Sequence, residues 1–128
     1  MPGNEEMKAA MRAYVERLNA GDLDGVLALF APDATVEDPV GTGIQQGSEA
    51  LRGFYGMAIA NNARLEIVGP QVGSSGDYAA MPILVEVTVP GAPKMRMNAI
   101  ETMRFNEAGK VVEMRAYWGQ EDMSMAAD

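Results

Sequence analysis

Apolar residues in the first 20 positions recur with the spacing of an amphipathic helix. Asn4 precedes Glu5 and Glu6, and acidic side chains near a helix start are favoured by the helix dipole. Gly21 follows the last apolar position and is typical of a helix end. The apolar stripe between these signals comprises Met7, Ala10, Met11, Tyr14, Val15 and Leu18. The spacing therefore predicts a first helix with one buried face.

Two further helices are indicated before the pattern changes. Asp22 can cap a short helix that Pro32 stops, because proline cannot continue the helical hydrogen-bond ladder. Ser48 can cap a longer helix over the segment SEALRGFYGMAIA. Their buried faces are expected to be Leu23, Val26, Leu27 and Phe30 in the second helix, and Leu51, Phe54, Tyr55 and Ile59 in the third.

The rest of the chain alternates apolar and polar residues with period two, which is typical of β-strands. A short strand is expected at residues 35–38, before the third helix. Four longer runs follow that helix, at residues 64–69, 78–89, 95–105 and 110–118. Helices first and a meander afterwards predict an α+β fold, in which three helices pack on one face of a curved, mainly antiparallel sheet. No linker or repeat divides residues 1–128, so we expect a single domain.

The composition limits the possible chemistry. The chain carries 10 basic and 18 acidic residues, and its net charge of −8 opposes binding to nucleic acid or to anionic membranes. It has no cysteine and no histidine, which excludes thiolate nucleophiles, the common serine triad and imidazole metal sites. Acid–base work is left to carboxylates, Tyr and Lys, and no metal or organic cofactor is expected. The N-terminus resembles no signal peptide and no run is long enough to span a membrane, so we expect a soluble, cytoplasmic protein.

Three polar residues fall on apolar faces of the predicted elements. Asp38 shares a strand face with Val36, and Glu101 alternates with the apolar residues of MRMNAIETMRF. Tyr14 belongs to the apolar stripe of the first helix. Burying an unpaired carboxylate is costly or raises its pKa, so such residues are seldom placed inside without a partner or a purpose. The pattern predicts that Tyr14, Asp38 and Glu101 converge in one interior site.

Each of these residues also has a purely structural interpretation. Tyr14 alone is more often a core tyrosine whose hydroxyl bonds a backbone carbonyl. Asp38 precedes Pro39, and such a pair often opens a turn. A bulge would shift the register and turn Glu101 to solvent. The 11 methionines fit gap-filling in a core, and their pliable thioethers would equally suit a pocket for a flat apolar ligand.

The order of these residues resembles that of bacterial Δ5-3-ketosteroid isomerases. Tyr14 lies in the first helix, Asp38 in DATVEDPVG, Tyr55 in GSEALRGFY and Glu101 in AIETMRF, so the likeness covers about residues 8–119. It implies the cone-shaped barrel of the NTF2-like or SnoaL-like superfamily, a fold that hosts many unrelated activities. It also implies a homodimer formed through the sheet and an apolar substrate, a 3-oxo-Δ5-steroid.

The resemblance implies a role for each matched residue. Asp38 matches the general base that moves a proton between two steroid carbons, and Tyr14 and Glu101 match the two donors of hydrogen bonds to the dienolate oxygen. Tyr55 matches a tyrosine that bonds the donor tyrosine, and Trp118 matches a pocket wall near the base. Further pocket walls are expected from Met81, Met97, Ala99 and Met103.

Two positions depart from that family's pattern. Glu101 stands where the pattern has Asp, and the added methylene shifts the donor by roughly 1 Å. Phe30 stands where some members carry a further tyrosine, which shortens the hydrogen-bond chain behind Tyr14. The expected activity is steroid Δ-isomerisation. The alternatives are another enzyme of the same fold, such as a polyketide cyclase or an epoxide hydrolase, and a pocket protein that binds sterols or related lipids without turnover.

Overall fold

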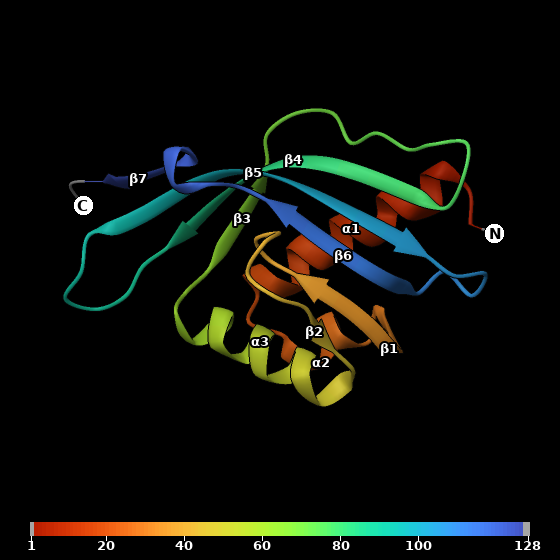
Figure 1. The fold of residues 1–128 in the computed structure, drawn as a ribbon, viewed down its shortest axis with the longest axis horizontal. Coiled ribbons are helices and arrows are strands. Elements are labelled where there is room, and N and C mark those ends of the chain that lie inside the picture. Colours follow the sequence, from red (N-terminus) through yellow and green to blue (C-terminus); the bar gives the residue numbers. More distant parts are fainter. Residues whose placement is uncertain (1, 127–128) are drawn as a thin grey trace.

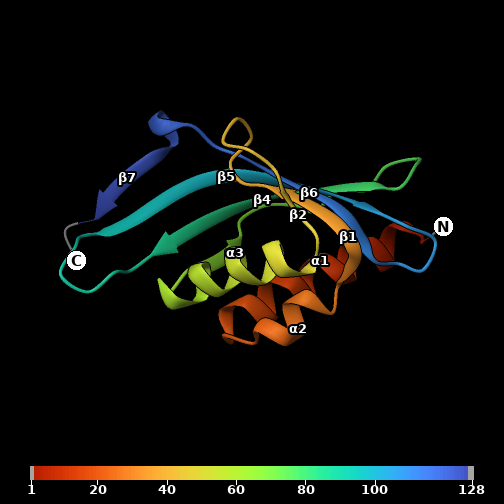
Figure 2. The ribbon, with the colours of Figure 1, turned by 60° about the horizontal axis from the view of Figure 1, so that its bottom comes forward.

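The computed structural model describes residues 2–126, which form one curved sheet with helices packed against its concave side. All three α-helices lie on the same side of the arch in Figure 2. This arrangement confirms the predicted α+β class, in which three helices pack on one face of a curved sheet. No helix among residues 2–126 is both long and apolar enough to cross a membrane.

The first two helices begin where the sequence predicts. Helix α1 is Asn4–Asn19 and α2 is Leu23–Leu27. The carboxylate of Asp22 caps α2 by accepting a hydrogen bond from the backbone N–H of Gly25 at 2.9 Å. The buried face of α1 consists of Met7, Met11, Tyr14, Val15 and Leu18, as its apolar spacing indicates.

The second helix is shorter than predicted, because Phe30 belongs to the sheet. Phe30 opens strand β1 (Phe30–Glu37) and pairs with Val111 of strand β6 (Val111–Tyr117). Pairing between residues so distant in sequence overrides the local helical spacing. Strand β1 is therefore longer than the predicted strand at 35–38, and Asp38 is the first residue after it.

Helix α3 is Ser48–Ala60, and its N-cap is Gly47 instead of the predicted Ser48. Gly47 has a φ of 91°, a conformation that glycine adopts without strain. The Ser48 hydroxyl donates to the carbonyl oxygen of Pro32 at 3.4 Å, so it ties the start of α3 to β1.

The sheet has the strand order β2-β1-β6-β5-β4-β3, and β7 pairs separately with β5 (Figure 1). Strands β1 and β6 are parallel and the other pairs are antiparallel. The remaining strands are β2 (Gln45–Gln46), β3 (Arg64–Ile67), β4 (Tyr78–Val87), β5 (Lys94–Phe105) and β7 (Met123–Ala126). The sequence did not indicate β7, which follows a 3-10 turn at Gln120–Asp122.

The burial of β5 follows the predicted alternation. Glu101 and Met103 are buried, whereas Ile100 and Arg104 are exposed. The register shift between β5 and β6 comes only after Arg104, so it does not turn Glu101 to solvent. The concave face of β5 thus carries Glu101 toward the helices.

Candidate active site

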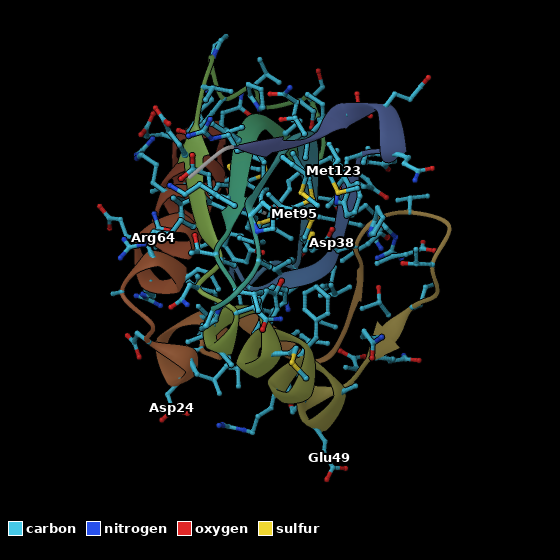
Figure 3. All side chains as sticks on the ribbon, turned by 90° about the vertical axis from the view of Figure 1, so that its left-hand side faces the viewer. Asp24, Asp38, Glu49, Arg64, Met95 and Met123 are labelled. Carbon is cyan, nitrogen blue, oxygen red and sulfur yellow. The ribbon has the colours of Figure 1, made fainter. Side chains whose placement is uncertain are left out.

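A cavity of about 210 Å³ lies between helices α1 and α3 and the concave face of the sheet. Tyr14, Tyr55 and Glu101 are buried and form its inner end. Phe54, Asn61, Ala58, Val87 and Trp118 are half-buried and form its mouth. Most of the other lining residues are apolar, and Asp38 also borders the space. Figure 3 views the molecule from one end and labels Asp38 near the centre of the view.

Asp38 is held at the cavity by the chain on both sides of it. Strand β1 ends at Glu37, and the backbone N–H of Val40 donates to the carbonyl oxygen of Ala116 at 2.8 Å. The indole Nε1 of Trp118 donates to Asp38 Oδ1 at 3.1 Å. Among the described residues Oδ2 accepts no hydrogen bond, so it is available to take a proton from a ligand.

Burial raises the pKa of Asp38, and the hydrogen bond from Trp118 partly opposes that rise. The side chain is half-buried and borders the cavity, so it keeps contact with water until a ligand enters. A carboxylate in this environment is a stronger base than an exposed aspartate, and it gains further basicity when a ligand displaces the remaining water.

Glu101 occupies a more extreme environment than Asp38. Its exposed fraction is only 2%, and within residues 2–126 its Oε1 is buried without a hydrogen-bond partner. Burial raises the pKa of Glu101 well above its ordinary range, and the negative charge of Asp38 raises it further. The favoured state is therefore a protonated Glu101 beside an ionised Asp38, which gives the cavity one neutral acid and one base.

Tyr14 and Tyr55 form a hydroxyl pair at the inner end of the cavity. Tyr14 Oη donates to Tyr55 Oη at 3.1 Å, and both rings pack in edge-to-face geometry. Burial raises both tyrosine pKa values, and an ionised Glu101 would raise them further, so both hydroxyls stay protonated. Hydroxyl rotors can reverse such a pair, so that Tyr55 donates to Tyr14 and Tyr14 donates to a ligand oxygen.

Phe30 closes this aromatic group without extending the hydrogen-bond chain. Its ring centroid lies 6.3 Å from that of Tyr14 and 5.6 Å from that of Tyr55. A phenylalanine here supplies packing and no hydroxyl, so the chain behind Tyr14 consists of Tyr55 alone among the described residues.

The structure brings most of the predicted site residues together. Tyr14, Asp38, Tyr55, Met97, Ala99, Glu101 and Trp118 all line the cavity. Met81 and Met103, which we expected in the pocket wall, belong instead to the hydrophobic core. Met81 pairs with Glu101 across β4 and β5 and shares its face, but it does not line the cavity, and α1 packs against β4. The alternation along the strands therefore predicted correctly that Met81 and Met103 face inward. It could not show how far α1 covers that face and excludes residues from the cavity.

Some lining residues were not predicted as pocket residues from the sequence. Asn61 is the first residue after α3 and places an amide at an otherwise apolar mouth. Val85 and Val87 bring the end of β4 into the wall. Their place in the alternation of β4 could have indicated the inward face. Nothing in the local sequence marks Asn61.

The donor set is not that of a metal centre. Among residues 2–126 no three acidic, histidine or cysteine side chains lie close enough together to hold a metal ion. The two carboxylates in the cavity would supply proton transfer and hydrogen bonding by themselves.

The sequence of the chain that forms this cavity matches a known protein family. The sequence profile of the SnoaL-like domain matches residues 11–114. The chain is 37% identical over 130 residues to epoxide hydrolase LasB of Streptomyces lasalocidi, and 34% identical over 118 residues to steroid Delta-isomerase of Nocardioides simplex. These alignments cover 99% and 92% of this chain. The chain spans about half the length of the epoxide hydrolase (46%) and 94% of the isomerase.

The similar solved structures, like the relatives in sequence, include an epoxide-related enzyme and a protein linked to steroids. The epoxide hydrolase/cyclase-like enzyme SalBIII, described in pyran ring formation in the polyether salinomycin, superposes with a TM-score of 0.90 at 26% identity and covers 95% of this chain and 97% of its own. A Mycobacterium tuberculosis protein in complex with estradiol-17beta-hemisuccinate superposes with a TM-score of 0.88 at 27% identity, covering 94% and 98%.

Proposed function

The chain belongs to the SnoaL-like family, and we propose that it is a steroid Δ-isomerase, which converts 3-oxo-Δ5-steroids into their conjugated Δ4 isomers. Family members include isomerases, epoxide hydrolases and cyclases, and a relative that aligns over almost its whole length is a steroid isomerase. A structural neighbour of similar fold holds a steroid derivative. The apolar cavity with two carboxyl groups and one tyrosine donor supports this choice among them.

In this proposal Asp38 and the oxyanion donors have separate tasks. Asp38 Oδ2 takes a proton from the carbon between the carbonyl group and the double bond, and the electron pair moves onto the carbonyl oxygen. The resulting dienolate oxygen accepts hydrogen bonds from the hydroxyl of Tyr14 and the carboxylic acid of Glu101. Asp38 then returns the proton to the far carbon of the dienolate, which leaves the conjugated enone and the original enzyme.

The unpaired Oε1 of Glu101 is the observation that carries the proposal. A protonated carboxyl group without a partner among the described residues can donate to a ligand oxygen without breaking an existing bond. An ionised Glu101 would repel the dienolate, and its burial next to Asp38 disfavours that form. The donor is thus held ready in a site from which a ligand displaces water.

The test is an isomerase assay with androst-5-ene-3,17-dione, in which the conjugated enone is followed by its ultraviolet absorbance. We expect turnover by the wild-type protein and almost none by Asp38→Asn. Binding of the product, measured by quenching of Trp118 fluorescence, distinguishes an inactive binder from a protein without a steroid site. Binding without turnover would favour the sterol- or lipid-binding alternative.

A second candidate, intramolecular opening of an epoxide, is favoured by the same acid–base pair. Glu101 would protonate the epoxide oxygen while a hydroxyl of the substrate attacks carbon and Asp38 accepts the hydroxyl proton. The 37% identity to an epoxide hydrolase supports this reaction class. Mass spectrometry of a hydroxy-epoxide after incubation separates the outcomes, because cyclisation leaves the mass unchanged and hydrolysis adds one water.

The proposed assembly is a homodimer formed through the convex face of the sheet. Ile100 and Tyr117 are each 46% exposed on that face, and apolar groups at a subunit contact favour association. Ile100→Asp should shift the protein to monomers in analytical ultracentrifugation, whereas an unchanged mass would place any dimer contact elsewhere. A cytoplasmic location remains a prediction from the sequence.

A further inference from the structure

The concave face of the sheet continues past the mouth of the cavity onto the end of β4, the start of β5 and strand β7, and the last two of these extend beyond the helices (Figures 1 and 2). Residues directly opposite each other in an antiparallel pair point to the same face, and so do residues two apart in one strand. The register therefore aligns two rows of apolar side chains across the three strands. These rows, which we call the methionine platform, are Val85, Met97 and Met123, and Val87, Met95 and Met125.

The methionine platform begins inside the cavity and ends in solvent. Val85, Val87 and Met97 line the cavity. Met123 pairs with Met97, and Met125 pairs with Met95 and is 62% exposed. Figure 3 shows Met95 and Met123 on the sheet side of the opening, above α3 in this view. A ligand leaving the cavity along the sheet would contact these side chains next.

The opposite face of the same strands has a different chemistry. Arg96 Nε lies 2.7 Å from Glu86 Oε2, and Lys94 Nζ lies 3.8 Å from Glu86 Oε1. These charged residues alternate with the platform residues along β4 and β5, so the charges lie on the outer face and the apolar groups on the inner face. An exposed apolar face that continues directly from a pocket is typical of a ligand-binding surface.

The cavity is too small for a ligand of the expected kind by itself. Its volume is about 210 Å³, whereas pockets for drug-sized ligands have about 300–1,000 Å³. The part of the ligand that does not fit must leave through the mouth. The thioethers at this exit are flexible and polarisable, so they can adapt to apolar groups of different shape.

We propose that the methionine platform is a second subsite, which binds the apolar far end of a ligand whose oxygen-bearing end lies at Tyr14 and Glu101. The proposal rests on the proposed function for the chemistry of the near end. It assigns to the site an elongated apolar substrate class, such as a sterol skeleton that carries an alkyl side chain, in place of a compact one. Strand β7 acts here as a specificity element, since it supplies Met123 and Met125.

The experiment compares two steroid products that differ at the far end, androst-4-ene-3,17-dione and cholest-4-en-3-one. Dissociation constants are measured by quenching of Trp118 fluorescence for wild type, Met125→Ser and the control Met57→Ser. Met57 is 63% exposed, close to the 62% of Met125, but lies on α3 and does not line the cavity. Met125→Ser should weaken the binding of cholest-4-en-3-one by about tenfold, which is the loss of affinity expected when apolar side-chain contacts are removed. It should change the affinity for androst-4-ene-3,17-dione by less than twofold, and Met57→Ser should affect neither ligand.

A second pair of probes, octan-2-one and tetradecan-2-one, separates this proposal from the steroid proposal. Met125→Ser should bind the longer ketone about tenfold more weakly than wild type does, and its affinity for the shorter ketone should be unchanged. If neither steroid binds but Met125→Ser weakens the binding of the longer ketone alone, the steroid proposal fails and the subsite stands. Equal affinities of both long ligands for wild type and Met125→Ser, or no binding of either to the wild type, overturn the subsite. A changed oligomeric state of Met125→Ser in analytical ultracentrifugation also overturns it, in favour of a subunit contact.

Discussion

The protonation of Glu101 can be measured without any substrate, through the pH dependence of folding stability. The raised pKa of Glu101 means that the folded protein keeps a proton which the unfolded chain releases near its ordinary value of 4.5. Stability from this group is therefore complete below that pH and is lost as the pH rises toward the folded pKa. While the folded state holds one more proton, the loss is about 1.4 kcal/mol per pH unit.

The comparison is best made in the background Asp38→Asn, because the pKa of Asp38 is also raised and would add a slope of its own. Burial, the main cause of the shift at Glu101, remains in that background. Between pH 5.5 and 6.5 the free energy of unfolding of Asp38→Asn should fall by about 1 kcal/mol relative to Asp38→Asn/Glu101→Gln, because the folded state keeps a proton that the unfolded chain has almost completely released. Both tyrosines of the site stay protonated in this range.

The assay is urea unfolding at both pH values, followed by Trp118 fluorescence and by far-ultraviolet circular dichroism. Coincident transitions justify a two-state analysis, and equal m-values show that the two proteins expose similar surface. Parallel stability curves would refute the reasoning, because Glu101 would then ionise in the fold as it does in the unfolded chain. It could not act as a neutral donor to an oxyanion.

Four further outcomes are expected. Asp38→Asn should abolish most isomerisation while binding of the enone product is kept, and a rate loss below about tenfold would exclude Asp38 as the base. Tyr14→Phe should lower kcat by about 10²- to 10³-fold, and an unchanged rate would assign Tyr14 to the core alone. Glu101→Leu should lower the rate at least about tenfold, whereas Glu101→Asp should raise it if the longer side chain is misplaced; rates equal to that of the wild type for Glu101→Leu, Glu101→Gln and Glu101→Asp would remove Glu101 from the chemistry. Met81→Ala should cost about 2–5 kcal/mol of stability in urea unfolding, with KM unchanged, because Met81 is a core residue.

The class of fold could be predicted because the signals are local. The spacing of apolar residues changes from helical to alternating after α3, and the stripe of α1 and the face of β5 follow directly from it. The errors occur where pairing with a segment that is distant in sequence determines the local structure. Phe30 joins the sheet through Val111, and β7 exists because the first residues of β5 offer it an edge. Neither partner is visible in the neighbouring sequence.

Part of the site could be predicted because its polar residues lie on faces that the apolar pattern marks as buried. Asp38 and Glu101 were found as acids on apolar faces, and Tyr14 as a hydroxyl within an apolar stripe. Met81 was expected in the wall but lies in the core outside the cavity lining, because alternation gives the face of the strand but not the reach of α1. Asn61 obeys the local rules as the residue that ends a helix, so no signal separates it from other helix ends.

Glu101 also shows why stability and chemistry oppose each other in this protein. An unpaired buried oxygen costs about 1–3 kcal/mol, and an apolar side chain of similar length at the same place would not incur that cost. Packing alone therefore gives no reason for a carboxyl group at position 101, whereas it fully accounts for Met81 or Met103. A ligand oxygen that accepts the proton of Glu101 would remove the cost at the moment of binding, so the same atom that weakens the empty fold favours the occupied one.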